Sequence, residues 1–191
     1  MEVLANVSIL EDAKAARAVN ADGIGLVRTE MLFIKANRLL NEDEQYENYA
    51  KIVEAMDGKP VTFRLLDVGG DKPLPHIHME EEANPYLGWR GARFLLGSPR
   101  IFAAQLRALA RASTGGNGSL RIMFPMVVDQ VQVRELVNFT AKTLEKAGVG
   151  RDRFGIGVMF EVPGACLAAA EILKHVDFGS IGTNDLIQYL L

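Results

Sequence analysis

Short apolar runs alternate with longer amphipathic segments along the whole chain. A short run rich in β-branched and aromatic residues is typical of a buried strand, whereas apolar residues three or four positions apart are typical of a helix. On this basis we expect strands over residues 3–9, 25–28, 61–66, 120–124, 155–160 and 178–182. Regular alternation of strands and helices predicts parallel strands joined by helical crossovers.

The amphipathic segments between these strands predict the helices. Asn41 followed by Glu44 predicts a capping box at one helix start, and Gly58 is a typical stop after that helix. Ser98 and Pro99 predict another start, because proline suits the first helical position. We expect helices over residues 11–19, 41–57, 86–96, 99–112, 129–148 and 164–175, and a last helix that begins at Asp185.

Parallel strands with helical crossovers are compatible with an open doubly wound sheet or with a closed eight-unit barrel. A (β/α)8 barrel takes roughly 31 residues per unit, so a chain of 191 residues corresponds to about six units. That number agrees with the six expected strands. We therefore expect an α/β fold of the TIM-barrel type that is incomplete, with about six of eight βα units. This partial barrel would occupy residues 1–191, with no second domain.

Composition narrows the class of protein further. The chain is 49% hydrophobic and 24% charged, with a formal net charge of −3, which is ordinary for a globular protein and excludes a disordered or collagen-like chain. Its single cysteine, Cys166, excludes an intramolecular disulfide scaffold. The slightly acidic balance argues against a nucleic-acid partner, and no apolar run approaches the roughly 18 residues of a membrane span. We expect a cytoplasmic protein with no nucleic-acid or membrane partner.

Two arginines lie at the ends of the second and third expected strands, where parallel α/β folds carry their functional side chains. Arg28 follows an apolar strand and either pairs with Glu30 or binds an anion. Arg64 lies within an apolar strand, and an arginine in such a position is rarely buried without a partner. It either pairs with a carboxylate such as Asp67 or faces a ligand.

Acidic side chains end the fifth and sixth strands. Glu161 follows a run of apolar residues, a costly position for a carboxylate unless it binds a cation or a hydrogen-bond donor. Asn184 and Asp185 follow the sixth strand and either cap the next helix or contribute to a site. Adjacent parallel strands lie roughly 4.8 Å apart, so Glu161 and Asp185 could both bind one Mg²⁺. With the two arginines, they indicate a Mg²⁺-dependent enzyme acting on a small phosphorylated or carboxylated substrate.

Six ordered segments, spread over almost the whole chain, resemble one enzyme family. They are GIGLVRTE with LF (23–33), RLLDVGGDK (64–72), EANPYLGWR (82–90), MFPM (123–126), MFEVP (159–163) and SIGTNDL (180–186). Together they resemble the PEP-utilising family, which includes enzyme I of the sugar phosphotransferase system, pyruvate phosphate dikinase and phosphoenolpyruvate synthase. The Gly-Gly-Asp-Lys loop after the third strand is most similar to that of enzyme I.

The resemblance assigns roles to the charged residues at the strand ends. It implies that Arg28 and Arg64 bind the phosphate of phosphoenolpyruvate, and that Glu161 and Asp185 bind Mg²⁺ as the cofactor.

Three further residues are placed near the substrate by the resemblance. Asn184 would hold the substrate through its backbone or its amide. Lys72 and Arg90 match residues close to the substrate, although a salt bridge is the alternative for Arg90.

Two groups that the family needs are not found in matching positions. The family transfers the phosphoryl group to a histidine on a separate swivelling domain, and a cysteine near a later barrel strand protonates the enolate of pyruvate. His76, His78 and His175 lie in no matching motif, and Cys166 is in the wrong place to be that acid. We therefore expect both catalytic groups to lie outside this chain, which alone should not catalyse the full reaction.

The expected function is that of the phosphoenolpyruvate-binding part of an enzyme I-like phosphotransferase, with phosphoenolpyruvate and pyruvate as substrate and product. A phosphocarrier protein would be the partner of the complete protein. One alternative is the same barrel from a dikinase or a phosphoenolpyruvate synthase. A second is a non-catalytic fragment that binds ligand weakly or self-associates. Unpaired sheet edges on a six-stranded barrel also predict a homodimer.

Overall fold

The computed structural model of this chain describes residues 1–69, 83–84, 87–114 and 120–191. Within these ranges six parallel strands form one sheet in the sequential order β1-β2-β3-β4-β5-β6. The strands are β1 (Leu4–Val7), β2 (Gly23–Arg28), β3 (Val61–Arg64), β4 (Leu120–Phe124), β5 (Phe154–Phe160) and β6 (Phe178–Ile181). This order excludes the doubly wound alternative, whose strand order reverses at a switch point.

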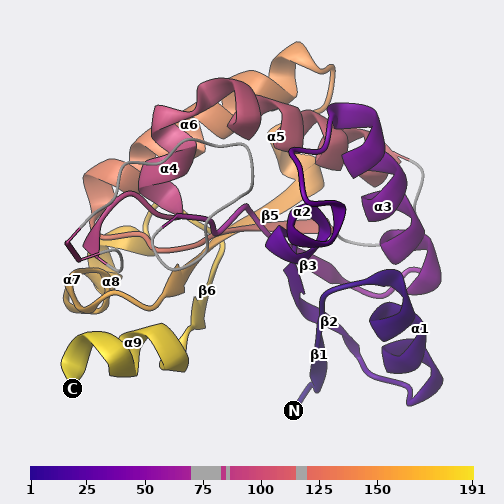
Figure 1. Cartoon of the computed structure of the whole chain (residues 1–191), viewed down its shortest axis with the longest axis horizontal. Coiled ribbons are helices and arrows are strands. Elements are labelled where there is room, and N and C mark those ends of the chain that lie inside the picture. The colour runs from indigo at the N-terminus through magenta and orange to yellow at the C-terminus, as the bar shows by residue number, and fades with distance from the viewer. Residues whose placement is uncertain (70–82, 85–86, 115–119) are drawn as a thin grey trace.

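Helices surround the curled sheet, with α1, α3, α5 and α6 around its outer side (Figure 1). They are α1 (Leu10–Ala18), α2 (Glu30–Ala36), α3 (Glu42–Ala55), α4 (Ala92–Gly97), α5 (Pro99–Thr114), α6 (Gln130–Lys146), α7 (Pro163–Leu167), α8 (Ala169–Ile172), α9 (Thr183–Leu190) and a 3₁₀ helix, η2 (Arg151–Arg153). The edge strands β1 and β6 do not pair with each other, so the barrel is open. The expected α/β fold, a TIM-barrel type with six βα units, is confirmed.

The core lies between the sheet and the outer helices. Every residue of β3 is buried, as expected for a parallel strand covered on both faces. Tyr49 of α3 packs edge-on against Phe63 of β3, with ring centroids 5.0 Å apart, and Phe102 of α5 stacks on Phe139 of α6 at 4.6 Å. Burying one such ring fully is worth about 1.5–3 kcal/mol. These contacts fix the helices against the strands whose ends carry the charged residues.

The capping box predicted at Asn41 is confirmed. Asn41 caps α3: its Oδ1 accepts a hydrogen bond from Glu44 N at 3.0 Å, and Asn41 N donates to Glu44 Oε2 at 2.9 Å. The side chain of Asp129 caps α6 by accepting from Gln132 N at 2.8 Å. In the described part of the chain, we find no helix with the length and apolar character of a bilayer span.

Two expected helices differ in the structure. Of the helix expected over residues 86–96, Leu87 is in a 3₁₀ turn, residues 88 to 91 are not helical, and Tyr86 lies outside the described residues. Gly91 has a φ of 56°, and Arg90 forms an isolated antiparallel bridge with Gly69, so this segment is held in a turn until α4 begins. The helix expected over 164–175 is divided into α7 and α8 at Ala168, where ψ is 12°.

One helix was not expected, and the start of another was wrong. The short helix α2 follows Thr29 directly, and Asn37 ends it in the left-handed conformation with a φ of 54°. Leu32 and Phe33 of α2 are buried, so tertiary packing stabilises a helix that is too short to form alone. The last helix, α9, begins at Thr183 and not at Asp185, and its first turn has no side-chain cap. The capping role considered for Asn184 and Asp185 is therefore wrong.

Candidate active site at the carboxyl end of the sheet

A cavity of about 430 Å³ opens inside the curled sheet, between the edge strands β1 and β6. Its lining comes from β1, β2, β3, β5, β6 and the start of α9. Five of the seven predicted site residues line it, and these are Arg28, Arg64, Glu161, Asn184 and Asp185. Residues that the sequence placed at separate strand ends thus share one cavity.

The other two predicted site residues are placed differently. Arg90 is 1% exposed and does not belong to the lining of this cavity. Lys72 lies outside the described residues.

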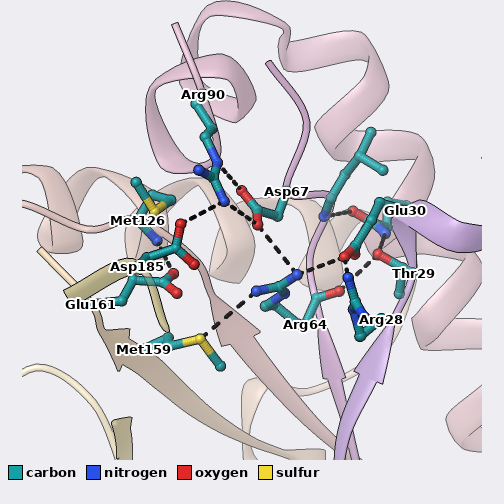
Figure 2. A network of polar contacts seen from close by, with 12 residues as sticks. Arg28, Thr29, Glu30, Arg64, Asp67, Arg90, Met126, Met159, Glu161 and Asp185 are labelled. Atoms are coloured by element: carbon teal, nitrogen blue, oxygen red, sulfur yellow. Dashed lines mark hydrogen bonds and ion pairs between the residues drawn. The ribbon is translucent and has the colours of Figure 1, made fainter. Parts of the chain in front are cut away.

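Glu30 connects the two arginines at the ends of β2 and β3 (Figure 2). Its Oε1 accepts from Arg28 Nε at 3.3 Å and from Arg64 Nη2 at 2.7 Å. The carboxylate is fully buried, whereas the Arg28 side chain is 44% exposed. The Arg28–Glu30 salt bridge weighed from the sequence is confirmed, and Arg28 also faces the cavity. One buried carboxylate therefore orients two guanidinium groups.

Arg64 is the most enclosed cation of the cavity. Besides Glu30, its Nη2 lies 3.2 Å from Asp67 Oδ2, and its Nη1 lies 3.8 Å from Met159 Sδ. Burial lowers the pKa of Arg64, but the charges of Glu30, Asp67 and Glu161 outweigh burial and raise it above the usual value. The guanidinium therefore remains charged. Its Nε is buried and has no hydrogen-bond acceptor within the described residues, which leaves a donor for an incoming anion.

Asp67 extends this network to Arg90. The Arg90 fork donates to both carboxylate oxygens of Asp67, from Nε at 3.0 Å and from Nη2 at 3.1 Å. Arg90 Nη2 also lies 2.9 Å from Asp185 Oδ1. The salt bridge considered for Arg90 is thus present, and it holds Asp185, a predicted metal ligand, against the buried network (Figure 2). Contact of Arg90 with a substrate stays a prediction.

Glu161 lies directly after β5 on the opposite side of the cluster from Glu30. Its Oε1 accepts from the backbone N–H of Met126 at 2.7 Å, which is the donor that the position after an apolar strand required. Met126 has a φ of 52°, and this left-handed turn directs the N–H toward the carboxylate. A Cβ on Gly182 would lie 2.8 Å from Glu161 Cβ, so glycine provides the space for this side chain.

The carboxyl of Glu161 is poised to change its charge near neutral pH. Burial raises its pKa to about 7, while Arg64 and the Met126 N–H lower it and the charges of Asp67 and Asp185 raise it further. Oε2 of Glu161 is buried and without a hydrogen-bond partner among the described atoms. A charged oxygen in that position is costly until it binds a proton or a cation.

The pH dependence of stability tests the raised pKa of Glu161. Between pH 4.5 and about 7, the folded chain holds a proton on Glu161 that the unfolded chain has lost, so the free energy of unfolding falls as the pH rises. The loss is on the order of 3 kcal/mol. Urea unfolding of the chain and of Glu161→Gln at pH 5 and pH 8 measures it, because the difference between the two proteins isolates this carboxyl. Equal pH dependence in both proteins would contradict the raised pKa.

The donor set at Glu161 and Asp185 fits a divalent cation in part. Within the described ranges no group of three or more His, Cys, Asp or Glu side chains forms a metal site. The two carboxylates nevertheless line the same cavity, and Glu161 Oε2 lacks a partner in the described part of the chain. Two carboxylate oxygens suit Mg²⁺, which commonly takes its remaining ligands from phosphate oxygens and water.

Several features of the site could not be read from the sequence. Glu30 and Asp67 were recognised only as partners of single arginines, whereas each connects two of them. The Met126 N–H was not assigned a role, although Met126 lies in the MFPM segment that resembles the family. Of the two roles considered for Asn184, the capping role is wrong, because the residue lies in the first turn of α9, whereas its place in the site agrees with the cavity lining.

A curled parallel sheet with helices around its outer side, and with its cluster of charged side chains at the carboxyl ends of the strands, is typical of α/β domains of the TIM-barrel class. The family profile described as "PEP-utilising enzyme, PEP-binding domain" matches residues 1–191. The chain therefore belongs to the family of PEP-utilising enzymes.

Curated relatives align with the whole chain. It is 45% identical over 195 residues to a phosphoenolpyruvate-protein phosphotransferase of Geobacillus stearothermophilus, and 42% identical to one of Bacillus subtilis. It is 46% identical to a multiphosphoryl transfer protein of Rhodobacter capsulatus. The alignment covers 100% of this chain in each case, but 33%, 34% and 23% of those relatives, respectively. The chain thus spans about a third or less of their length.

Proposed function

We propose that this chain is the phosphoenolpyruvate-binding part of an enzyme I-like phosphotransferase, with residues 1–191 as a partial barrel domain. The observation that carries the proposal is the convergence of Arg28 and Arg64, oriented by one buried carboxylate, on a cavity that Glu161 and Asp185 also line. The names of the curated relatives favour the phosphotransferase over the dikinase and synthase alternative.

In this proposal the phosphate of the substrate binds on the side of the cavity that carries the two arginines. Arg28 and Arg64 bind the phosphate, because guanidinium groups match phosphate oxygens in geometry and charge. Asn184 holds the substrate at the start of α9, while Arg90 and Lys72 contribute from nearby. Donors oriented in advance need no rearrangement when negative charge develops on the phosphate.

Glu161 and Asp185 are the residues that would hold Mg²⁺. When bound there, the ion would neutralise negative charge on the phosphoryl oxygens. Met126 keeps Glu161 in place through its N–H, and Arg90 keeps Asp185 in place through its guanidinium. These two contacts would fix both carboxylates before a ligand arrives.

The complete protein would pass the phosphoryl group to a histidine on a separate domain and then to a phosphocarrier protein, in the cytoplasm and in the service of sugar transport. The relatives' names, which refer to phosphoryl transfer to protein, support this assignment. A homodimer is part of the same proposal, since β1 and β6 both present unpaired edges within the described sheet.

Arg28 offers the cleanest test of the proposed site, because its partly exposed side chain can be removed with little risk to the fold. We expect Arg28→Ala to weaken phosphoenolpyruvate binding by about tenfold to a hundredfold, since a hydrogen bond to a charged group is worth about 1.5–3 kcal/mol. Isothermal titration calorimetry with phosphoenolpyruvate in the presence of Mg²⁺ measures this change.

Arg134→Ala is the matched control, because Arg134 is exposed on α6 and does not line the cavity. Its affinity for phosphoenolpyruvate should equal that of the unsubstituted chain. Equal affinity of the Arg28→Ala protein, or no binding by the unsubstituted chain, would overturn the proposed function.

A further inference from the structure

A buried amide on α5 connects the ends of β2 and β3 from behind the cavity. Gln105 is 1% exposed, and its Oε1 accepts from the backbone N–H of Leu66 at 3.0 Å. Its Nε2 donates to Thr29 Oγ1 at 3.1 Å. Gln105 therefore bonds both to the residue after Arg28 and to the segment that follows Arg64. It does not line the cavity itself.

Thr29 completes the connection between the two strands. Its hydroxyl donates to the backbone oxygen of Arg64 at 2.8 Å while it accepts from Gln105. Thr29 is fully buried and, like Gln105, is absent from the cavity lining. The neighbours of both arginines are thus joined by side-chain hydrogen bonds with defined directions (Figure 2 shows Thr29 beside Arg64).

The amide of Gln105 has one orientation only. Its second N–H donates to Tyr49 Oη at 3.1 Å, and that hydroxyl in turn donates to Gln45 Oε1 at 3.2 Å. If the amide were reversed, the NH₂ group of Gln105 would face the backbone N–H of Leu66, and two donors would lie opposite each other. All hydrogen-bonding directions of this buried network are therefore satisfied, which favours a single arrangement.

Backbone pairing between β2 and β3 ends at the two arginines. The β2–β3 register is irregular between Ile24 and Val27, and the pairing stops at Arg28 and Arg64. Beyond that pair, Leu65 N bonds to Met123 O of β4 and not to β2. The contacts of Thr29 and Gln105 continue the β2–β3 connection directly after its last backbone pair, Arg28 and Arg64.

We propose that Thr29 and Gln105 are positioning residues that set the separation of Arg28 and Arg64 for a phosphate group. This inference rests on the proposed function, because it assumes that both arginines bind the phosphate. Neither residue touches the ligand. They act through the backbone of the two arginines, where a displacement of about 1 Å is enough to cost up to a hundredfold in a precisely oriented site.

Thr29→Val and Thr29→Ser form a matched pair for the test. Valine keeps the shape of threonine without the hydroxyl, whereas serine keeps the hydroxyl. We expect Thr29→Val to weaken phosphoenolpyruvate binding about tenfold in calorimetry with Mg²⁺. Thr29→Ser should restore affinity to within about twofold of the unsubstituted chain, because it keeps the bond to the Arg64 oxygen.

A double-mutant cycle with Arg28→Ala separates positioning from a general structural role. If Thr29 acts by setting the separation of the two arginines, its replacement by valine should cost less than about threefold once Arg28 is absent. If Thr29 had only a structural role, Thr29→Val would weaken binding by the same factor whether or not Arg28 is present.

Three outcomes would overturn the inference: unchanged affinity in Thr29→Val, no rescue by serine, or the full loss in the Arg28→Ala background. If Thr29→Val is unfolded at the assay temperature, Gln105→Met removes the bonds from α5 to Thr29 and Leu66 but leaves the bond from Thr29 to the Arg64 oxygen. Unchanged affinity in Gln105→Met overturns the inference, which assigns a positioning role to both residues. Failure of the proposed function looks different, because the unsubstituted chain would then not bind or would bind as Arg28→Ala does.

Discussion

Replacing Arg64 with alanine is expected to weaken phosphoenolpyruvate binding at least about a hundredfold and to destabilise the folded chain by about 3–5 kcal/mol. Arg64 supplies one of the two guanidinium groups at the cavity, and it is the closer partner of the fully buried Glu30, at 2.7 Å. Without it, Glu30 keeps only the longer contact with Arg28, so a buried negative charge loses most of its compensation. Calorimetry and urea unfolding measure the two effects.

Two controls separate charge from geometry and from fold. Arg64→Lys keeps the charge but not the planar fork, so it should recover part of the stability while binding stays weak. Arg121→Ala removes a partly buried arginine from the second residue of β4, outside the cavity, and should bind phosphoenolpyruvate normally. Tight binding by a folded Arg64→Ala protein would show that the phosphate does not bind here.

Replacing Gly69 with alanine should lower the free energy of unfolding by roughly 3 kcal/mol and weaken ligand binding at the same time. Gly69 has a φ of 109°, and a Cβ on it would lie 1.9 Å from the backbone oxygen of Trp89. The bridge between Gly69 and Arg90 must then open. The guanidinium of Arg90 pairs with Asp67 and Asp185, so a displacement of Arg90 also displaces Asp185, which lines the cavity.

Gly58→Ala is the matched control for this substitution. Gly58 also has a positive φ, 84°, but a Cβ there would meet no atom within 4 Å. Its cost should be only the roughly 1–2 kcal/mol of a left-handed alanine, with unchanged ligand affinity. Urea unfolding of both variants measures the difference, and a Gly69→Ala protein that is no less stable than Gly58→Ala would refute the role of the bridge.

The parts of the fold that depend on nearby residues were predictable. The strand over residues 120–124 and the Asn41 cap of α3 agree with the structure because their signals lie within a few residues. The helix α2 and the break at Ala168 depend on packing between elements, which periodicity does not describe. The segment before α4 is set by Gly69, more than twenty residues earlier in the chain.

The charged residues of the site could be identified from the sequence, but the ion pairs and hydrogen bonds between them could not. Strand ends identify Arg28, Arg64 and Glu161, since parallel strands bring their carboxyl ends to one rim. Which carboxylate meets which guanidinium depends on register and on side-chain direction. Gln105 is 76 residues from Thr29 and looks like an ordinary helix residue, so only the folded arrangement reveals its contacts with both strand ends.

The positive and negative groups around the cavity nearly balance, with one more carboxylate than guanidinium groups. They comprise three guanidinium groups, those of Arg28, Arg64 and Arg90, and four carboxylates, those of Glu30, Asp67, Glu161 and Asp185. Within the described residues, this cluster has no excess of positive charge to attract an anion. A ligand with both a phosphate and a carboxylate would add negative charge to it, at a depth where solvent screens poorly. Anion binding should therefore depend on a cation that enters with it or on a proton retained by Glu161, and by thermodynamic reciprocity the anion should strengthen the binding of that cation to the same degree.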